Sequence, residues 1–189
     1  MSNSKITGRN RVFSGKWLLL EELLFTAKDG NSHIWESVSR TNETEAVAII
    51  ATLHPSNRIL LIRQYRPPAE GYVIELPAGL IEQNENIIDT AVREVYEETG
   101  YTGEIKKVFP MSYSSPGFSD ESVCLATMEI DETLDINKNV SQNLEITEDI
   151  EVLKVERNAL LDFMLEAKKN GNSIDAKLFC IAYGMSIQL

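Results

Sequence analysis

The stretch that decides the fold of this chain runs from Gly79 to Tyr101 and reads GLIEQNENIIDTAVREVYEETGY. From about residue 86 to residue 99, apolar side chains recur at the spacing of one helix face. They are Ile88, Ala91, Val92 and Val95. Gly100 follows where a left-handed C-terminal cap belongs. The stretch therefore predicts a loop that leads into an amphipathic helix.

Three carboxylates are expected on one side of this helix. Glu94, Glu97 and Glu98 stand at positions i, i+3 and i+4, and side chains at that spacing are neighbours. Like charges so placed destabilise a helix by roughly 0.2–0.5 kcal/mol per pair. A hard divalent cation would reverse the sign of that interaction, because such ions bind carboxylate oxygens. Taken alone, the three glutamates also fit a solvated acidic helix face.

Strands and helices alternate on both sides of this stretch. Residues 17–40 predict two strands joined by a turn at 28–31, where Asp-Gly favours a tight hairpin. Further strands are predicted at 46–53, 58–65, 72–76, 105–111, 122–130 and 150–155. Loops are predicted at 77–84 and 131–147, and helices at 157–169 and 173–185. This order indicates an α/β fold with α/β/α layers.

Composition narrows the classes of partner. The formal net charge of the 189 residues is -11, which disfavours nucleic acid as a partner. The apolar run at 18–25 is interrupted by Glu21 and Glu22 and is too short to cross a bilayer, so no membrane partner is expected. The first residues lack the apolar core of a secretory signal, and a cytoplasmic location is expected. Cys124 and Cys180 are too isolated for a disulfide scaffold and are predicted to be buried.

The decisive stretch resembles the Nudix box of the Nudix hydrolase family at every fixed position. The matching residues are Gly79, Glu85, Arg93, Glu94, Val95, Glu97, Glu98, Gly100 and Tyr101. A match at so many positions in a loop–helix context is specific. The resemblance implies a Nudix-type α/β/α sandwich with a mixed sheet, in which residues 44–189 form the hydrolase domain. It also implies that residues 1–43 form a small β-subdomain for dimerisation and base binding.

The resemblance assigns roles that agree with the physical argument. It implies metal ligands at Glu94, Glu97 and Glu98 and at the backbone carbonyl of Ala78. The expected cofactor is Mg²⁺, with Mn²⁺ as the alternative, at two or three ions. These ions would neutralise a diphosphate and lower the pKa of an attacking water. Glu85 and Arg93 are expected to form a pair that braces the loop against the helix.

Other segments are similar to the ADP-ribose and ADP-sugar pyrophosphatase branch of the family. They are Lys-Trp at 16–17, WESVSRT at 35–41, QYRPPAEGYVIELPAGLI at 64–81, and Pro116 in SSPGFSDE. The similarity implies hydrolysis of ADP-ribose to AMP and ribose 5-phosphate by a homodimer whose N-terminal strands exchange. One departure is Ser115, which stands where the human member has an aspartate before Pro-Gly.

The same similarity implies a set of substrate-binding residues. Trp17 and Trp35 would stack on the adenine, although packing is the more usual role of a tryptophan in a strand. Arg66 would bind phosphate through paired hydrogen bonds. Arg40 would contact the ligand, from either subunit. The remaining residues expected near the ligand are Glu36, Glu75, Leu80 and Pro116.

Two assignments have alternatives: the residue that acts as general base, and the substrate. Glu148, at the end of the polar loop, is the expected base, and Glu121 is the alternative. A pyrophosphatase for GDP-mannose or ADP-glucose is the first rival function. A non-catalytic ADP-ribose-sensing module is the second, although such modules usually lose carboxylates that are all present here.

Overall fold

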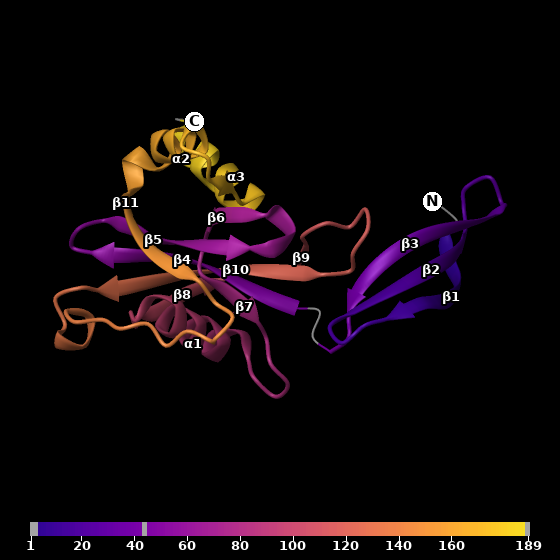
Figure 1. Cartoon of the computed structure of the whole chain (residues 1–189), viewed down its shortest axis with the longest axis horizontal. Coiled ribbons are helices and arrows are strands. Elements are labelled where there is room, and N and C mark those ends of the chain that lie inside the picture. Colours follow the sequence, from indigo (N-terminus) through magenta and orange to yellow (C-terminus); the bar gives the residue numbers. More distant parts are fainter. Residues whose placement is uncertain (1–3, 43–44, 188–189) are drawn as a thin grey trace.

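The computed structural model describes residues 4–42 and 45–187. Its first part is an antiparallel sheet that stands apart from the main body (Figure 1). This sheet comprises β1 (Lys5–Ser14), β2 (Leu18–Thr26) and β3 (Ser32–Arg40), in that spatial order. The predicted β2–β3 hairpin is confirmed. Strand β1 was not predicted, because register shifts at residues 6–8 and 11–13 disturb the alternation by which a strand is recognised.

The main body is built on a second, mixed sheet of nine strands among the described residues. Its central order is β12-β6-β5-β4-β10-β8, while β11 pairs with β5, β7 with β4 and β9 with β10. The β4–β10 and β6–β12 pairs are parallel, and the other pairs are antiparallel. The strands are β4 (Glu45–His54), β5 (Arg58–Arg66), β6 (Gly71–Glu75), β7 (Ala78–Leu80), β8 (Glu104–Val108), β9 (Ser112–Tyr113), β10 (Ser122–Asp131), β11 (Ile150–Glu156) and β12 (Ser173–Ile174).

Helices cover both faces of this sheet (Figure 1). Helix α1 (Ile87–Thr99) lies on one face, and α2 (Leu160–Lys169) and α3 (Ala176–Ser186) lie on the other. Short 3-10 turns occupy η1 (Pro67–Ala69), η2 (Asp135–Asn137) and η3 (Arg157–Ala159). Each face has its own apolar core: Ala91 and Val95 of α1 pack in one, and Met164 and Leu178 in the other. The predicted α/β/α layering is confirmed.

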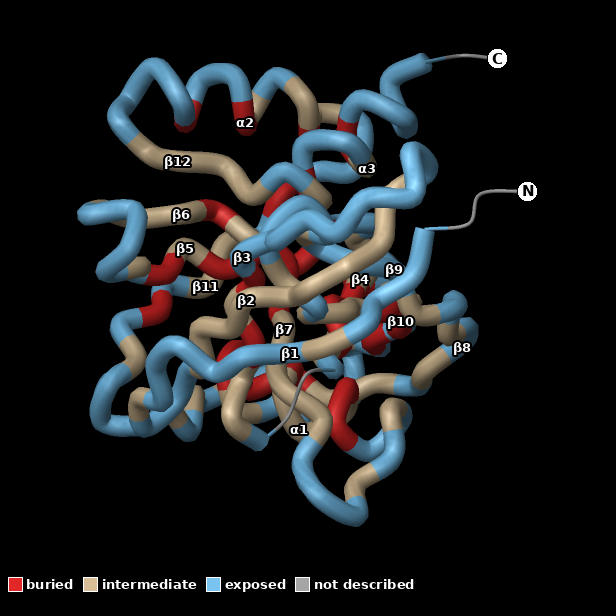
Figure 2. Tube along the Cα trace, turned by 90° about the vertical axis from the view of Figure 1, so that its right-hand side faces the viewer, coloured by how far each residue is buried: buried red, intermediate tan, exposed pale blue. Residues whose placement is uncertain are grey.

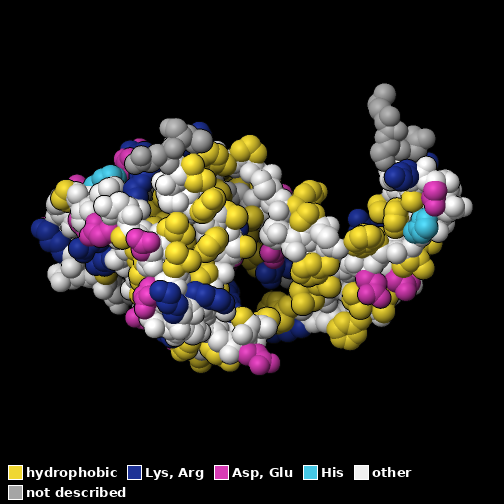
Figure 3. Space-filling model, turned by 90° about the horizontal axis from the view of Figure 1, so that it is seen from above, with side chains coloured by type: hydrophobic (Ala, Val, Ile, Leu, Met, Phe, Trp, Pro, Cys, Tyr) yellow, Lys and Arg dark blue, Asp and Glu magenta, His cyan; other side chains and the backbone are white. Residues whose placement is uncertain are grey.

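Burial separates the two sheets. Buried residues concentrate in the central strands of the main body, whereas β1 is almost entirely exposed (Figure 2). Large apolar side chains of the N-terminal sheet face solvent (Figure 3). They include Val12, Phe13, Leu18 and Ile34, each between 49% and 63% exposed. The N-terminal sheet therefore has little core of its own within one chain.

Local signals account for the ends of α1. The side chain of Asn86 accepts hydrogen bonds from the backbone N–H groups of Ile88 and Asp89, which caps the first turn. Gly100 ends the helix with φ of 77°, the left-handed conformation that glycine adopts without strain. Both predicted ends of α1 are confirmed. The helix is therefore placed by its own sequence, and the carboxylates on it are placed with it.

Three expectations are corrected by the structure. Residues 173–174 were predicted to begin the last helix but form β12, because they pair with residues 73–74 of β6. Residues 78–80 lie inside the predicted 77–84 loop but form β7, because their backbone pairs with residues 46–48 of β4. Cys180 was predicted to be buried, yet it is exposed on α3, because the other face of this largely apolar helix supplies the core contacts. Cys124 is buried as predicted. Within residues 4–42 and 45–187, no helix is long and apolar enough to cross a membrane.

Candidate active site

A cavity of about 940 Å³ opens between α1, strand β7, the 138–149 loop and the start of α3. Its volume falls within the roughly 300–1,000 Å³ range of small-molecule sites. Trp17 and Arg40, from the ends of the N-terminal sheet, also line it. Of the residues predicted to bind substrate or metal, those on its wall are Trp17, Arg40, Arg66, Glu75, Ala78, Leu80, Glu94 and Glu97. The predicted general base Glu148 also lines it.

Negative charge dominates the cavity. Eight carboxylates line it, from Glu75, Glu82, Glu94, Glu97, Glu121, Glu145, Glu148 and Asp175. Four cations accompany them: Arg40, Arg66, Arg93 and Lys177. An anionic ligand would be repelled by such a wall unless cations entered with it.

Each of these four cations is held by a carboxylate. Arg66 makes two parallel bonds of 2.8 Å to Glu75, which raise the pKa of the guanidinium. The Nε of Arg40 donates to Glu121 at 3.0 Å. The Nζ of Lys177 lies 2.8 Å from Asp175. The two parallel bonds to Glu75 fix the direction of the Arg66 guanidinium and leave its Nη1 group to face a ligand.

Glu98 lies beneath the cavity wall and is 3% exposed. Burial, and next the charge of Glu94, raise the pKa of its carboxyl to about 9. The backbone N–H of Ala78 donates to Glu98 at 3.1 Å. Burial also raises the pKa of Glu94. Glu94 and Glu98, on adjacent turns, are therefore partly stripped of water. The charge of Arg93 beside Glu94 offsets only part of this cost, because the pKa of both carboxyls remains raised, and a bound cation would relieve the rest.

Arg93 ties the loop and the helix together. Its Nε and Nη2 atoms each donate to Glu85 at 2.9 Å, and this pairing lowers the pKa of Glu85 to about 2. The predicted Glu85–Arg93 pair is therefore present. The Nη1 atom of Arg93 lies between Glu94 and Glu97, at 2.8 and 3.0 Å. Among the described residues, no three ligand side chains are already gathered around one point.

The donor set nevertheless fits a hard divalent cation. Its side-chain donors are the carboxylate oxygens of Glu94, Glu97 and Glu98, which Mg²⁺ and Mn²⁺ prefer. Gly79 leaves room for them: a Cβ atom at this position would overlap the carboxylate of Glu94. A larger residue at position 79 would push Glu94 away, so the close approach of β7 to the Glu94 carboxylate requires a glycine there.

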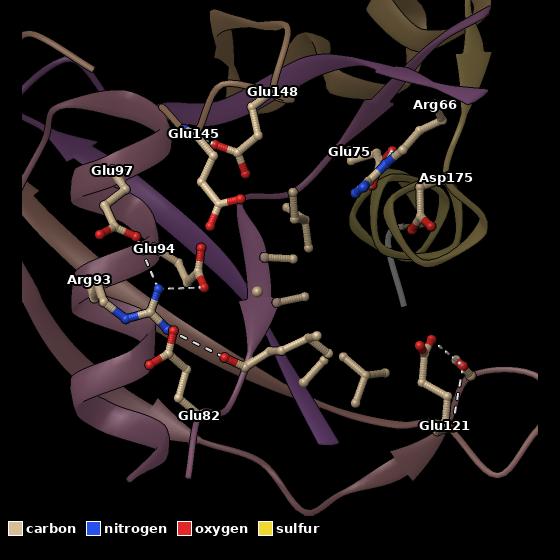
Figure 4. A pocket seen from close by; sticks show the side chains of 18 of the residues that line it. Arg66, Glu75, Glu82, Arg93, Glu94, Glu97, Glu121, Glu145, Glu148 and Asp175 are labelled. Atoms are coloured by element: carbon tan, nitrogen blue, oxygen red, sulfur yellow. Dashed lines mark hydrogen bonds and ion pairs between the residues drawn. The ribbon is translucent and has the colours of Figure 1, made fainter. Parts of the chain in front are cut away.

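Two carboxylates considered for the general base differ in their surroundings. Glu148 lies close enough to Glu94 and Glu98 for its charge to raise the pKa of each, and it enters the cavity from the 138–149 loop (Figure 4). Glu121 lies at another side of the cavity (Figure 4). It accepts bonds from Arg40 at 3.0 Å and from the Ser114 hydroxyl at 3.1 Å. Those bonds occupy both oxygens of the Glu121 carboxylate.

Three predicted substrate residues do not line the cavity of this chain: Trp35, Glu36 and Pro116. The indole N–H of Trp35 donates to the carbonyl of Gly117 at 2.8 Å. The backbone N–H of Val38 donates to Phe118 at 2.7 Å. Strand β3 thus packs against the loop that carries Pro116, and Trp35 is bonded to that loop. Trp17 lies on the cavity wall, so the two tryptophans do not face the same ligand position within one chain.

Asp175 and Lys177 were not predicted to be near the site. Asp175 caps α3 by accepting bonds from the backbone N–H groups of Lys177 and Leu178. An Asp before an apolar run is a helix-start signal, but it does not show where that helix start will lie. Only the packing of α3 against the sheet brings these two side chains to the cavity.

Comparisons with known proteins show which domain family the chain resembles. The NUDIX domain family model matches residues 43–178. The chain is 35% identical over 178 residues to an ADP-ribose pyrophosphatase of Saccharomyces cerevisiae, covering 90% of this chain and 77% of the relative. It is 30% identical over 192 residues to an ADP-sugar pyrophosphatase of Mus musculus, covering 97% and 87%. The crystal structure of an ADP compounds hydrolase superposes with a TM-score of 0.68 at 17% identity, covering 86% of this chain and 83% of that one.

Proposed function

The chain belongs to the NUDIX domain family and is a Nudix hydrolase, and on that basis we propose that it hydrolyses ADP-ribose to AMP and ribose 5-phosphate with Mg²⁺. The observation that carries the proposal is the carboxylate-rich cavity over α1, lined by paired arginines and by Trp17. A nucleoside diphosphate sugar has a diphosphate that the arginines and a carboxylate-bound cation could bind. It also has a flat base that could stack on Trp17. The names of the yeast and mouse relatives support the same substrate class.

The proposed cation site uses Glu94, Glu97, Glu98 and the Ala78 carbonyl. A divalent cation bound there offsets the charge of the diphosphate and makes water a better nucleophile. The free N–H edge of Arg66 orients a phosphate oxygen, because Glu75 already holds the other edge of the guanidinium. Binding and orientation supply much of the rate enhancement in phosphoryl chemistry.

The carboxylate of Glu148 is the proposed general base. As the water oxygen forms its bond to phosphorus, Glu148 accepts the proton, and the bridging P–O bond breaks to release the two monophosphates. The proximity of Glu148 to Glu94 and Glu98 supports this role. Glu121 is disfavoured by its bonds to Arg40 and Ser114.

A homodimer completes the proposal. The N-terminal sheet carries exposed apolar side chains that a second copy would cover. Trp17 lines the cavity of its own chain while Trp35 does not. Exchange of the N-terminal strands between subunits would let Trp35 of one chain approach the adenine held in the other.

The substrate is tested by incubating the purified chain with ADP-ribose, ADP-glucose or GDP-mannose in the presence of Mg²⁺. Products are resolved by chromatography, and Glu98→Gln is the control. Release of AMP, fastest from ADP-ribose, is the expected result. Faster release of GMP from GDP-mannose would favour the rival substrate. Calorimetric binding of ADP-ribose without AMP release would favour a sensing module.

A further inference from the structure

The far end of the 138–149 loop is anchored beside Glu148. The backbone N–H of Tyr65 donates to the carbonyl of Asp149 at 3.1 Å, and the hydroxyl of Tyr72 donates to the Asp149 carboxylate at 2.5 Å. The middle of the loop has no such support at Ile146, whose side chain is completely exposed. A loop with few buried contacts opens at low free-energy cost. Within the loop, Glu148 bonds to the backbone of Glu145 at 2.9 and 3.0 Å, so the place of this turn relative to α1 depends on how the loop ends are held.

The first half of the loop is held by Gln142, whose side-chain amide bonds to two separate elements. Its Nε2 atom donates to the carbonyl of Glu98 at 2.7 Å and to the carbonyl of Ile150 at 3.1 Å. The backbone N–H of Asn143 donates to the carbonyl of Glu97 at 2.8 Å. The last carbonyls of a helix lack partners within the helix, so these donors complete the C-terminal end of α1.

We propose that Gln142 is a positioning residue that fixes Glu148 relative to the carboxylates of α1. This inference rests on the proposed role of Glu148 as the general base. One N–H of the amide binds the helix at Glu98, and the other binds the first residue of β11 at Ile150. The segment between Gln142 and Ile150 is thereby closed at both ends onto the helix that carries Glu94 and Glu98. Glu148 therefore keeps its position relative to Glu94 and Glu98 when the loop or the helix moves.

The direct test is Gln142→Met, which has a similar length and no donor. We expect kcat for ADP-ribose to fall by about 10- to 100-fold, because small misplacements of a reacting group cost that much. The KM and the Tm should change little. Asn139→Ala, at an exposed position on the same loop, is the matched control and should keep normal kcat. A kcat of Gln142→Met within twofold of the wild type would overturn the inference.

A double-mutant cycle separates positioning from general structural damage. If Gln142 acts through Glu148, Gln142→Met should have about twofold effect or less when Glu148 is already Gln, because the two losses are not additive. An undiminished effect in that background would overturn the inference. A normal kcat for Glu148→Gln alone would overturn both the assigned base and the inference. A low kcat for Glu148→Gln with a normal kcat for Gln142→Met would overturn the inference alone.

Hydrogen exchange measured by mass spectrometry supplies a readout that does not depend on turnover. Gln142→Met should exchange faster than the wild type over residues 138–149, while residues 87–95 of α1 remain unchanged. Unchanged exchange in the loop would overturn the positioning role of Gln142, whichever nucleotide sugar the chain acts on. If the wild type does not hydrolyse ADP-ribose but Gln142→Met exchanges faster in the loop, the result would count against the proposed substrate and support the role of Gln142 in holding the loop.

Discussion

At the scale of single residues, burial is what distinguishes the carboxylates of α1 from an ordinary acidic helix face. Glu98 is 3% exposed and its pKa is raised to about 9, whereas a solvated glutamate would keep its ordinary value. Glu94 is shifted in the same direction by burial. A charged group in this position is unfavourable without a positive partner. A cation bound beside Glu98 would therefore stabilise the ionised form of this carboxyl group.

Cation binding should depend on pH through Glu98. With its pKa near 9, the Glu98 carboxyl is protonated at pH 7, and a cation can use it as a ligand only after the proton leaves. The apparent affinity for Mg²⁺ should therefore rise with pH up to about 9 and then level off. Binding at pH 7 should release about one proton, which calorimetry in buffers of different ionisation enthalpy measures.

The control for this prediction is Glu98→Gln, which has no proton to release. This variant should bind Mg²⁺ more weakly and without proton release. Its kcat should fall by about 30- to 1,000-fold, which corresponds to roughly 2–4 kcal/mol of transition-state stabilisation. Mg²⁺ binding to the wild type without any proton release at pH 7 would contradict the assigned state of Glu98.

At the scale of elements, the site is a joint between a loop, a helix and a strand. The loop before α1 is held by Glu85, the helix carries Arg93, and β7 supplies Ala78 and Gly79. Arg93 bonds to Glu85 and to the Leu80 carbonyl. The brace sets the distance between β7 and α1, and that distance decides whether the Ala78 carbonyl of β7 can share a cation with Glu94 and Glu98 of α1.

The brace should contribute to stability at neutral pH and lose that contribution in acid. The pKa of Glu85 is lowered from 4.5 to about 2 by its bonds to Arg93. The stabilisation is complete above pH 4.5 and is lost as pH falls toward 2. At pH 7, Glu85→Gln should cost roughly 1 kcal/mol, because charged hydrogen bonds are lost while Arg93 keeps its other partners.

Thermal unfolding followed by circular dichroism measures this effect. Glu85→Gln should lower the Tm by about 2–4 °C at pH 7, and the gap to the wild type should narrow at pH 3.5. Glu82→Gln, exposed on the same loop, should leave the Tm unchanged at both pH values. A gap that widens in acid would have the wrong sign for a lowered pKa.

At the scale of the whole molecule, the N-terminal sheet and the main body differ in how they are stabilised. The main body has apolar cores on both faces of its sheet. The N-terminal sheet exposes apolar side chains and contacts the main body through the loop that carries Pro116. An exposed apolar surface of this kind is typical of an interface.

A charge placed on that surface should break the proposed dimer. Phe13 is 63% exposed in one chain, so Phe13→Glu should cost the isolated fold little while burying an unpaired charge in a dimer. Light scattering should report a dimer for the wild type and a monomer for Phe13→Glu. Leu165→Glu, 46% exposed on α2, is the matched control and should remain dimeric. A Phe13→Glu dimer of unchanged stability would place the interface elsewhere.

Elements whose signals are local could be predicted from the residues of their own segment. The capped helix over residues 87–99 and the β2–β3 hairpin follow from spacings within a few residues, since helix periodicity, caps and turns are short-range. The Glu85–Arg93 pair was expected from the resemblance to the Nudix box. The family followed from the same short stretch. Strand β7 was missed, because three residues with no alternation acquire a strand only by pairing with β4.

Packing between elements places residues from distant parts of the chain around one cavity and sets their protonation there. Arg40 and Glu121 are 81 positions apart and bond at 3.0 Å, and the amide of Gln142 reaches Glu98 across 44 positions. Asp175 and Lys177 arrive with the last helix. Such contacts arise from packing between elements, which leaves no periodic trace in the sequence. The raised pKa of Glu98 has the same origin, because desolvation depends on what covers a residue.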